Sequence, residues 1–521
     1  MATVNLSKLL EDVKLKQDKI EFKDPAKDKD DLLVLKTNAT ALATLTDEQR
    51  ETQKAADRFL ASMATLLYNI DPTAEMIDKP TIQKLVARID QMVNDQINEI
   101  LHDASFREME ATWTSIEDLV RNTNFKANID INLLDITKEE AYDDLELNIA
   151  DIAGSEIFKK IYVAEYDQFG GLPYGALIGL YEFENTKRDI LWLEAIGKIS
   201  RHSHAPFIGA ASPKLFGRDT MAEVNQLRDI EGLFDTPRYA AWKQLREKDV
   251  AVYIGLTLPR YLVRQPYHPL ENPAEGINFE EKFSFTKIDD SGKVVAMEEK
   301  EIAEQYAWGN AAMLMARNIV RSFEQTGWCQ YLRGVKGGGM CAGLATHSYE
   351  FGGEKHLRGP VEITMADFRE YELAKAGFIP VIHKKGTAEA VFYSAQALKR
   401  PLAQENPKDA ENQQLAANMT YTFSVSRIAH YVKCIMRDNI GSAADASYIS
   451  GQIDRWIAQY VTTILNPDDL TLRYYPFKAY SVKVEEVPGK IGWYHCDLSV
   501  LPHIQFEGLD VDLRVDANLA K

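Results

Sequence analysis

The sequence of 521 residues lacks the features of membrane-spanning and exported proteins. No apolar run reaches the roughly 18 residues that a membrane span needs, and the N-terminus contains no apolar signal-peptide core. Cysteine is scarce, and no two of the four cysteines form a CxxC pair, so neither a zinc site nor a disulfide framework is indicated. We expect four reduced thiols in a cytoplasm: Cys329, Cys341, Cys434 and Cys496.

Sequence motifs of the common catalytic classes are also missing. The glycine-rich runs "FGGLPYG" (169–175) and "GVKGGGMCAG" (334–343) match neither G-x-x-x-x-G-K-[ST] nor a complete G-x-G-x-x-G. No G-x-S-x-G and no HExxH occurs. His202 and His204 have the spacing of two side chains on one face of a strand, but no nearby carboxylate or cysteine completes a metal set. We therefore predict no catalytic residue, no cofactor and no metal.

Two arrangements of cysteine keep an enzyme among the alternatives. His430 and Cys434 lie four residues apart on a predicted helix, a spacing that permits a Cys–His dyad. Cys329 or Cys341, near the glycine-rich run, offers a second nucleophile. Cysteine in an apolar stripe is usually part of the packing, and the reactivity of the thiols near neutral pH separates these alternatives.

The composition that is present is typical of a soluble globular protein. Hydrophobic residues make up 45% and charged residues 26% of the chain, and the length predicts two or three domains. The net charge of −18 argues against a protein that wraps nucleic acid, which needs a basic face.

The apolar pattern divides the chain into four regions. We predict an N-terminal helix and linker arm (1–40), a helical region (41–125), an α/β region (126–410) with an inserted loop at 268–300, and a C-terminal region (411–521) with a helix and a terminal strand pair. Strand-like runs such as "ANIDINLLDI" (127–136) and "VAVYIGLTL" (250–258) alternate with helix-like ones such as "NAAMLMARNIVRSFEQ" (310–325). The predicted fold class is therefore α/β, in its mixed α+β form.

The tail of the chain alternates apolar and polar residues, which predicts a terminal strand pair at 479–487 and 503–515. Such a pair has an exposed edge unless something covers it, and another chain can add a strand there.

Eight stretches, in this order, resemble the large sheath subunit of the bacterial type VI secretion system, the TssC/VipB family. The resemblance spans roughly residues 85–515. The stretches are "QINEILHDASFREMEATWTSIEDLV" (96–120), "EYDQFGGLPYGALIGLYEF" (165–183), "SHAPFIGAASPKLFG" (203–217), "YIGLTLPRYLVRQPY" (253–267), "WGNAAMLMARNIVRSFEQTGWCQYLRGVKGGG" (308–339), "GFIPVIHKKGTAEAVFYSAQ" (377–396), "SRIAHYVKCIMRDNIGS" (426–442) and "LPHIQFEGLDVDLRV" (501–515).

The resemblance implies a structural machine in the bacterial cytoplasm. The large subunit pairs with a small sheath subunit of the TssB/VipA type, and copies of the pair polymerise into a contractile helical sheath. The sheath encloses an inner tube of the Hcp type and stands on a baseplate. A AAA+ unfoldase of the ClpV type, or a substitute, dismantles it after contraction. A phage-tail-like sheath outside secretion is the alternative of the same structural class.

The resemblance also assigns roles to residues of this sequence. For strand exchange between subunits we predict an accepting hairpin and a donated strand "LLVLK" (32–36), with the residues Val482, Val484, Ile504, Phe506, Val511, Leu513, Leu33 and Val34. A tube-facing helix would carry Arg427, Lys433 and Arg437, although ion pairs within the chain to Asp438 or Asp445 explain these cations equally well.

Two further roles concern the N-terminus and the glycine-rich turn. The apolar face of a helix at 4–15 is either a handle for the unfoldase or an ordinary packed helix; it consists of Leu6, Leu9, Leu10 and Val13. A stiff turn in the core, packed by Tyr166, Phe169, Tyr174 and Tyr181, is predicted from Gly170, Gly171, Pro173 and Gly175.

Overall fold

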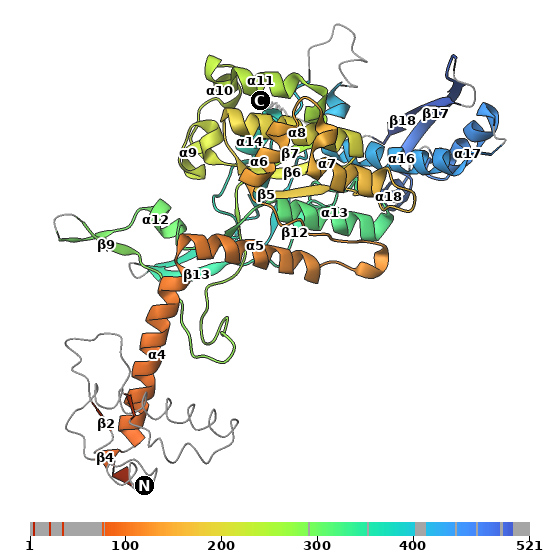
Figure 1. Ribbon diagram of the computed structural model, residues 1–521. Coiled ribbons are helices and arrows are strands. Elements are labelled where there is room, and N and C mark those ends of the chain that lie inside the picture. Colours follow the sequence, from red (N-terminus) through yellow and green to blue (C-terminus); the bar gives the residue numbers. More distant parts are fainter. Residues whose placement is uncertain are drawn as a thin grey trace, which may run out of the picture. The chain divides into compact units, whose positions relative to one another are not determined.

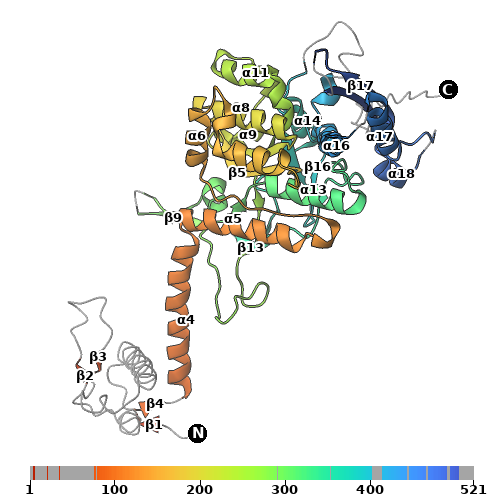
Figure 2. The same cartoon turned by 45° about the vertical axis from the view of Figure 1, so that its right-hand side comes forward.

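The computed structural model describes residues 79–289, 292–351, 354–401, 413–442, 445–464, 467–489 and 493–503, with four two-residue strands nearer the N-terminus (Figures 1 and 2). The chain forms two compact units. Unit 1 comprises Met1–His102 and Tyr267–Lys282, and unit 2 comprises Asp103–Pro266 and Phe283–Lys521. Helices and strands are mixed throughout unit 2, which confirms the predicted fold class.

Unit 1 contains the long helix α4 (Lys79–Leu101) and two short antiparallel strand pairs. Strand β1 (Val4–Asn5) pairs with β4 (Met76–Ile77), and β2 (Ile20–Glu21) pairs with β3 (Val34–Leu35). The predicted helix at 4–15 is therefore wrong at its start, because pairing with Ile77 holds the β-branched Val4 in a strand. The predicted handle residues Leu6, Leu9, Leu10 and Val13 lie outside the described residues.

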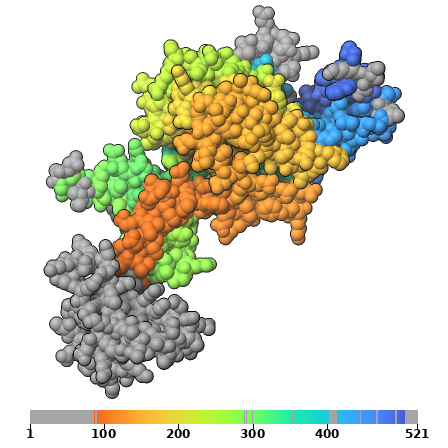
Figure 3. All heavy atoms as spheres, viewed as in Figure 1, coloured from red at the N-terminus to blue at the C-terminus, as the bar shows by residue number. Residues whose placement is uncertain are grey.

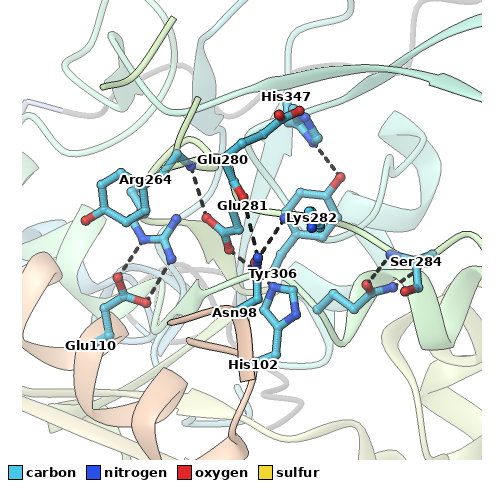
Figure 4. Close-up of polar contacts among 12 residues, drawn as sticks. Asn98, His102, Glu110, Arg264, Glu280, Glu281, Lys282, Ser284, Tyr306 and His347 are labelled. Carbon is cyan, nitrogen blue, oxygen red and sulfur yellow. Dashed lines mark hydrogen bonds and ion pairs between the residues drawn. The ribbon is translucent and has the colours of Figure 1, made fainter. Parts of the chain in front are cut away.

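Helix α4 confirms the predicted periodicity, but much of its apolar stripe is exposed within the described residues. Val86, Met92 and Ile100 are about half exposed, whereas Leu101 is buried. Buried Asn98 instead holds the segment 280–282, because its Oδ1 accepts from the backbone N–H of Lys282 at 2.9 Å (Figure 4). In addition, Nζ of Lys282 lies 2.9 Å from Asp95. Hydrogen bonds thus hold this loop on the helix.

The centre of unit 2 is a six-stranded sheet in the order β12-β16-β15-β7-β6-β5. Strands β5, β6, β7 and β15 are parallel, and β16 and β12 are antiparallel. The strands are β5 (Leu177–Phe183), β6 (Phe207–Ala211), β7 (Ile254–Leu258), β12 (Met340–Cys341), β15 (Ile379–His383) and β16 (Ala390–Phe392). The four parallel strands follow one another in chain order, whereas β12, at the edge beside β16, precedes both β15 and β16 in the sequence.

Successive residues of the central strands enter two hydrophobic cores, one on each face of the sheet. Phe207 packs with α8 (Lys187–Ser203), and the next residue, Ile208, packs with α13 (Ala312–Thr326). Gly209 is required for close packing, because a Cβ at this position would lie 2.8 Å from the ring of Phe183. Both faces are covered, which explains why the strands are nearly continuous apolar runs.

Further elements cover the sheet or extend from it (Figure 1). The helices are α5 (Ala104–Arg121), α6 (Lys138–Leu147), α7 (Glu156–Phe158), α9 (Met221–Asn225), α10 (Ile230–Phe234), α11 (Ala240–Glu247), α12 (Glu299–Ala303) and α14 (Asp367–Lys375). The 3₁₀ turns are Phe125–Ala127, Ile152–Gly154, Pro213–Phe216, Pro237–Tyr239 and Asp249–Tyr253. The remaining strands are β8 (Tyr261–Leu262), β9 (Thr286–Ile288), β10 (Val294–Ala296), β11 (Trp308–Gly309), β13 (His347–Phe351) and β14 (Glu354–Arg358).

The inserted loop (268–300) contains the antiparallel hairpin of β9 and β10. Two polar contacts fix the chain around it: Arg264 binds both carboxylate oxygens of Glu110 at 2.6 and 3.1 Å, and Oη of Tyr306 lies 2.7 Å from Nδ1 of His347 (Figure 4). The ion pair is largely buried, where geometry of this kind matters most for stability.

Three local predictions are wrong. Residues 128–136 alternate in polarity but form no strand, because the described residues offer them no pairing partner. His202 and Ser203 end helix α8 and His204 is its C-cap with φ 49°, so they are not on a strand. The glycine-rich turn lies at the surface rather than in the core, since Gly170 is exposed and the side chain of Phe169 is 81% exposed; Gly170 does adopt a positive φ of 82°.

Candidate functional site: the terminal hairpin and its supporting helix

The described residues of 413–503, which we call the lobe, lie at the surface of unit 2 and are coloured blue in Figure 3. Helix α16 (Met419–Asp438) joins this lobe to the sheet, because the side chains of Met419 and Phe423 belong to a sheet core and Ile428 belongs to the core of the lobe. The other elements of the lobe are α17 (Ala446–Ala458), α18 (Asp469–Tyr474), β17 (Phe477–Glu486) and β18 (Tyr494–Pro502).

Strands β17 and β18 form an antiparallel hairpin with two different faces. The inner face is apolar and partly buried; it contains the opposed pairs Tyr480–Val500, Val482–Leu498 and Val484–Cys496. The outer face is exposed and includes the pairs Lys483–Asp497 and Glu485–His495. This alternation places one side of the hairpin on the helices and the other in solvent.

The inner face packs on a small core that a tryptophan from outside the lobe completes. Trp328 is 3% exposed. The centroid of its ring lies 5.1 Å from that of Tyr460 and 5.3 Å from that of Phe477, both in edge-to-face geometry. Ile457 of α17 and Ile428 of α16 belong to the same core. The aromatic contacts therefore hold the hairpin and its helices on the rest of unit 2.

The hairpin has backbone groups that point outward. The N–H of Val487 donates to the carbonyl of Trp493 at 2.7 Å, which marks this as a hydrogen-bonded pair. Because such pairs alternate along an antiparallel ladder, the N–H groups of Val484 and Cys496 point away from each other, toward the outer edges. Within the part of the chain that the structure describes, β17 and β18 form a two-stranded sheet, supplemented by an isolated bridge between Val461 and Phe477.

A groove of 420 Å³ lies beside β18. Residues of β18, most of them from its inner face, form one side of the groove, and the C-terminal half of α16 forms another, together with Tyr166 and His204. Its lining residues are Tyr166, His204, Ala429, Val432, Lys433, Met436, Tyr494, His495, Cys496 and Leu498. The cationic or titratable groups Lys433, His204 and His495 face it, and none of the residues that line it is acidic.

Three side chains of α16 contact the body of unit 2, at the end of a π-helix (Lys159–Tyr166) and at the end of α8. Nζ of Lys433 lies 2.8 Å from Asp167 and 3.8 Å from the centroid of the Tyr166 ring. The guanidinium of Arg437 donates to the carbonyls of Tyr166 at 2.7 Å and Gln168 at 2.8 Å. His430 Nε2 lies 2.8 Å from the carbonyl of Ser203 and therefore donates to it. We call these three side chains, His430, Lys433 and Arg437, the α16 clamp.

Burial shifts the pKa values of the groups at this contact. Burial lowers the pKa of His430 to about 4, and it also lowers the pKa of His204. Burial raises the pKa of Tyr166 to about 12. At neutral pH both imidazoles and the phenol are therefore neutral beside the charged Lys433.

Acid is expected to weaken this contact through His430. The unfolded chain binds a proton at His430 below pH 6.5, whereas the folded protein binds it only near pH 4, so this contribution to stability is complete above pH 6.5 and is lost as the pH falls through 4. His430→Gln keeps an N–H donor for Ser203 and removes the titration. Urea unfolding midpoints between pH 7 and pH 4 should fall less steeply in this variant, and equal slopes in the two proteins would exclude the role.

The family of the chain follows from comparison with known proteins. The family model for the VipB tail sheath N-terminal domain matches residues 83–399, and the model for its gpW/gp25-like domain matches residues 408–519. The chain belongs to the VipB tail sheath family. The sheath protein TssC1 of the type VI secretion system of Pseudomonas aeruginosa is 38% identical over 489 residues, which cover 93% of this chain and 95% of that protein.

Two solved structures of a contractile particle also resemble the chain, at low similarity. The baseplate of the anti-feeding prophage matches with a TM-score of 0.37 and 9% identity over 75% of this chain and 84% of that chain. The contracted helical sheath of the same particle matches with a TM-score of 0.32 and 8% identity over 64% and 67%. The family assignment depends on the sequence matches alone.

Membership of the VipB family confirms the resemblance predicted from the eight sequence blocks, and with it the class of function: a large subunit of the contractile sheath of a type VI secretion system. The family is a structural one. No described helix is both long and apolar enough to cross a bilayer, and no cluster of potential metal ligands occurs among the described side chains.

The hairpin corrects the predicted register of the tail. Val482 and Val484 lie on β17 as expected, but the partner strand is 494–502 rather than 503–515. The strand begins earlier because Tyr494, Cys496, Leu498 and Val500 already alternate toward the core. Ile504, Phe506, Val511, Leu513 and Leu33 lie outside the described residues, and Val34 pairs with Glu21 of its own chain.

The three cations predicted to face a tube have partners within the chain. Arg427 lies 4.5 Å from the ring of Phe323 and donates to Oη of Tyr431 at 2.8 Å, while Lys433 and Arg437 belong to the α16 clamp. The acidic partner is Asp167, rather than the suggested Asp438 or Asp445; Asp445 caps α17. The clamp was missed because Asp167 is 266 residues away in the sequence.

Cys329 and Cys341 do not have the environment of a nucleophile. Burial raises the pKa of Cys329 and of Cys341 to about 11, which suppresses the reactive thiolate at neutral pH. The imidazole of His430 donates its Nε2 proton to the carbonyl of Ser203 rather than to Cys434. These observations argue against the cysteine-dependent enzyme that the sequence left as an alternative.

Proposed function

We propose that this chain is the strand-accepting subunit of the sheath: it pairs with a small sheath subunit, and each copy receives a strand from a neighbouring chain on the β17–β18 hairpin. The observation that carries the proposal is an amphipathic hairpin with outward-pointing backbone groups, packed on a rigid core through Trp328. Two-stranded sheets are marginal alone, and an added strand stabilises them. Residues 32–36 as the donated strand remain a prediction.

The energy of such a junction suits a polymer that must move. A strand of about five residues adds roughly four backbone hydrogen bonds at about 0.5–1.5 kcal/mol net each. A junction worth a few kcal/mol can open and close reversibly, whereas many such junctions together make a strong lattice. Because the backbone bonds do not depend on the angle between the joined bodies, the subunits can rotate as rigid bodies while the chains stay connected.

The remaining partners follow from the same proposal. The sheath would assemble in the bacterial cytoplasm on a baseplate, around an inner tube of the Hcp type, and a AAA+ unfoldase of the ClpV type or a substitute would dismantle it. A tube-facing role for Arg427, Lys433 and Arg437 remains a prediction, and it requires each cation to exchange a partner within the chain for one on the tube.

Co-expression tests the proposal. Expressed with the small sheath subunit from the same operon and imaged by negative stain, the chain should form long hollow tubules, and expressed alone it should form none. Chains that remain monomeric in the presence of the small subunit, with both proteins soluble and folded, would contradict the proposal.

A further inference from the structure

The α16 clamp contacts the body of unit 2 on the same side as the groove. His430, Lys433 and Arg437 are spaced i, i+3 and i+7 and therefore lie on one face of α16. That face meets the carbonyls of Ser203, Tyr166 and Gln168 and the carboxylate of Asp167. Lys433 of the clamp, and Tyr166, which the clamp contacts, also line the groove beside β18.

The body side of this contact is built to hold cations. The π-helix ends with the N–H of Asp167 bonded to the carbonyl of Tyr162 at 2.8 Å. The guanidinium of Arg437 donates to the carbonyl of Tyr166 and to that of Gln168, which also accepts from the N–H of Gly171. The centroid of the Tyr166 ring lies 3.8 Å from Nζ of Lys433 and 5.2 Å from the centroid of the His430 ring. Lys433 is 27% exposed, so its ion pair is partly protected from solvent.

The lobe is attached to the rest of unit 2 at several places. Met419 and Phe423 hold the first half of α16 in a sheet core, Trp328 anchors the hairpin and α17, and Arg473 bonds to the carbonyl of Lys336. The α16 clamp adds the contact that fixes the second half of α16, and with it the angle of that half relative to the body. The angle matters for β18 because the groove separates that strand from α16 and Tyr166.

We propose that Lys433 and Arg437 are positioning residues that fix the angle of α16 and thereby keep the groove beside β18 open for the incoming strand. This inference rests on the proposed function. The two cations act through Tyr166, which they hold as a wall of the groove, and Lys433 itself lines the groove beside that ring. π-Helical turns often occur at functional sites, and here the turn presents the carbonyls that the cation needs.

Substitution of the two cations tests the inference in the full chain. The double variant Lys433→Met, Arg437→Met should reduce the mass of tubules formed with the small subunit at least tenfold. Lys433→Arg retains a cation for Asp167 and Tyr166 and should assemble as the unsubstituted chain does. The matched control is Arg455→Met, because Arg455 is an exposed cation of the same lobe that bonds to Gly451 of its own helix; this control should also assemble normally.

A distance measurement separates positioning from general stability. Spin labels at exposed Leu172 and Ser499, in a chain whose exposed Cys434 is replaced by serine, report the separation of the turn and β18. The distribution of distances should broaden in the double variant and stay narrow in Arg455→Met, while the thermal midpoint changes by only a few degrees. A narrow distribution with normal tubules in the double variant would overturn the inference. Absence of tubules from the unsubstituted pair would instead overturn the proposed function.

Discussion

Replacing Cys496 with proline is expected to abolish tubule formation while the chain still folds. By the alternation of the ladder, the N–H of Cys496 points to the outer edge of β18, where an added strand would accept it. Proline removes this donor, and its ring obstructs the approach of another backbone. Because no bond within the hairpin uses this N–H, β17 and β18 remain paired. Sedimentation and negative stain of the co-expressed pair measure the loss.

Two matched variants make this test specific. Cys496→Val keeps the N–H and the partly buried apolar side chain, so its tubules should be normal. Val484→Pro removes the corresponding donor from the outer edge of β17, directly opposite Cys496, and shows whether that edge also receives a strand. Normal tubules from both proline variants would exclude strand addition to this hairpin.

Replacing Trp328 with alanine is expected to have the largest effect on stability. The side chain is 3% exposed and contacts Tyr460 and Phe477 in the core of the lobe. Truncation of a buried tryptophan to alanine costs about 3–5 kcal/mol through lost packing and the cavity that remains. Urea unfolding should show this loss, and amide hydrogen exchange should locate it in α17 and the hairpin.

The control for Trp328 is a tryptophan of the same unit that is not buried. Trp113 on α5 is 61% exposed, and its replacement by alanine should change the free energy of unfolding by no more than about 0.5 kcal/mol. If the two variants unfold alike, Trp328 does not anchor the lobe.

The parts of the fold that sequence patterns predicted are those with strong local signals. The helix-like run at 310–325 predicted helix α13, and the alternation of 479–487 predicted β17. The strand after it was placed too late, because the polar residues His495, Asp497 and Ser499 hide an alternation whose inner members are Tyr494, Cys496, Leu498 and Val500. The signal that could have located this strand is the two-residue period in which tyrosine, cysteine, leucine and valine occupy the inner positions.

The contacts that define the site depend on tertiary structure. Lys433 meets Asp167 and His430 meets Ser203 across more than two hundred residues, so spacing along α16 indicated nearby partners that it does not use. The same limit explains the alternating segment 128–136, where local propensity favours a strand but a strand also needs a neighbour. The family, by contrast, was predicted from eight ordered blocks, since many local similarities in one order constrain the whole chain.

A density map of the co-expressed tubules, at a resolution that traces the backbone, tests the central claim most directly. The account predicts a strand from another chain, hydrogen-bonded to an outer edge of the β17–β18 hairpin, in every subunit of the lattice. A map in which both edges of the hairpin face solvent, with the tubule held together by side-chain contacts elsewhere, would contradict it.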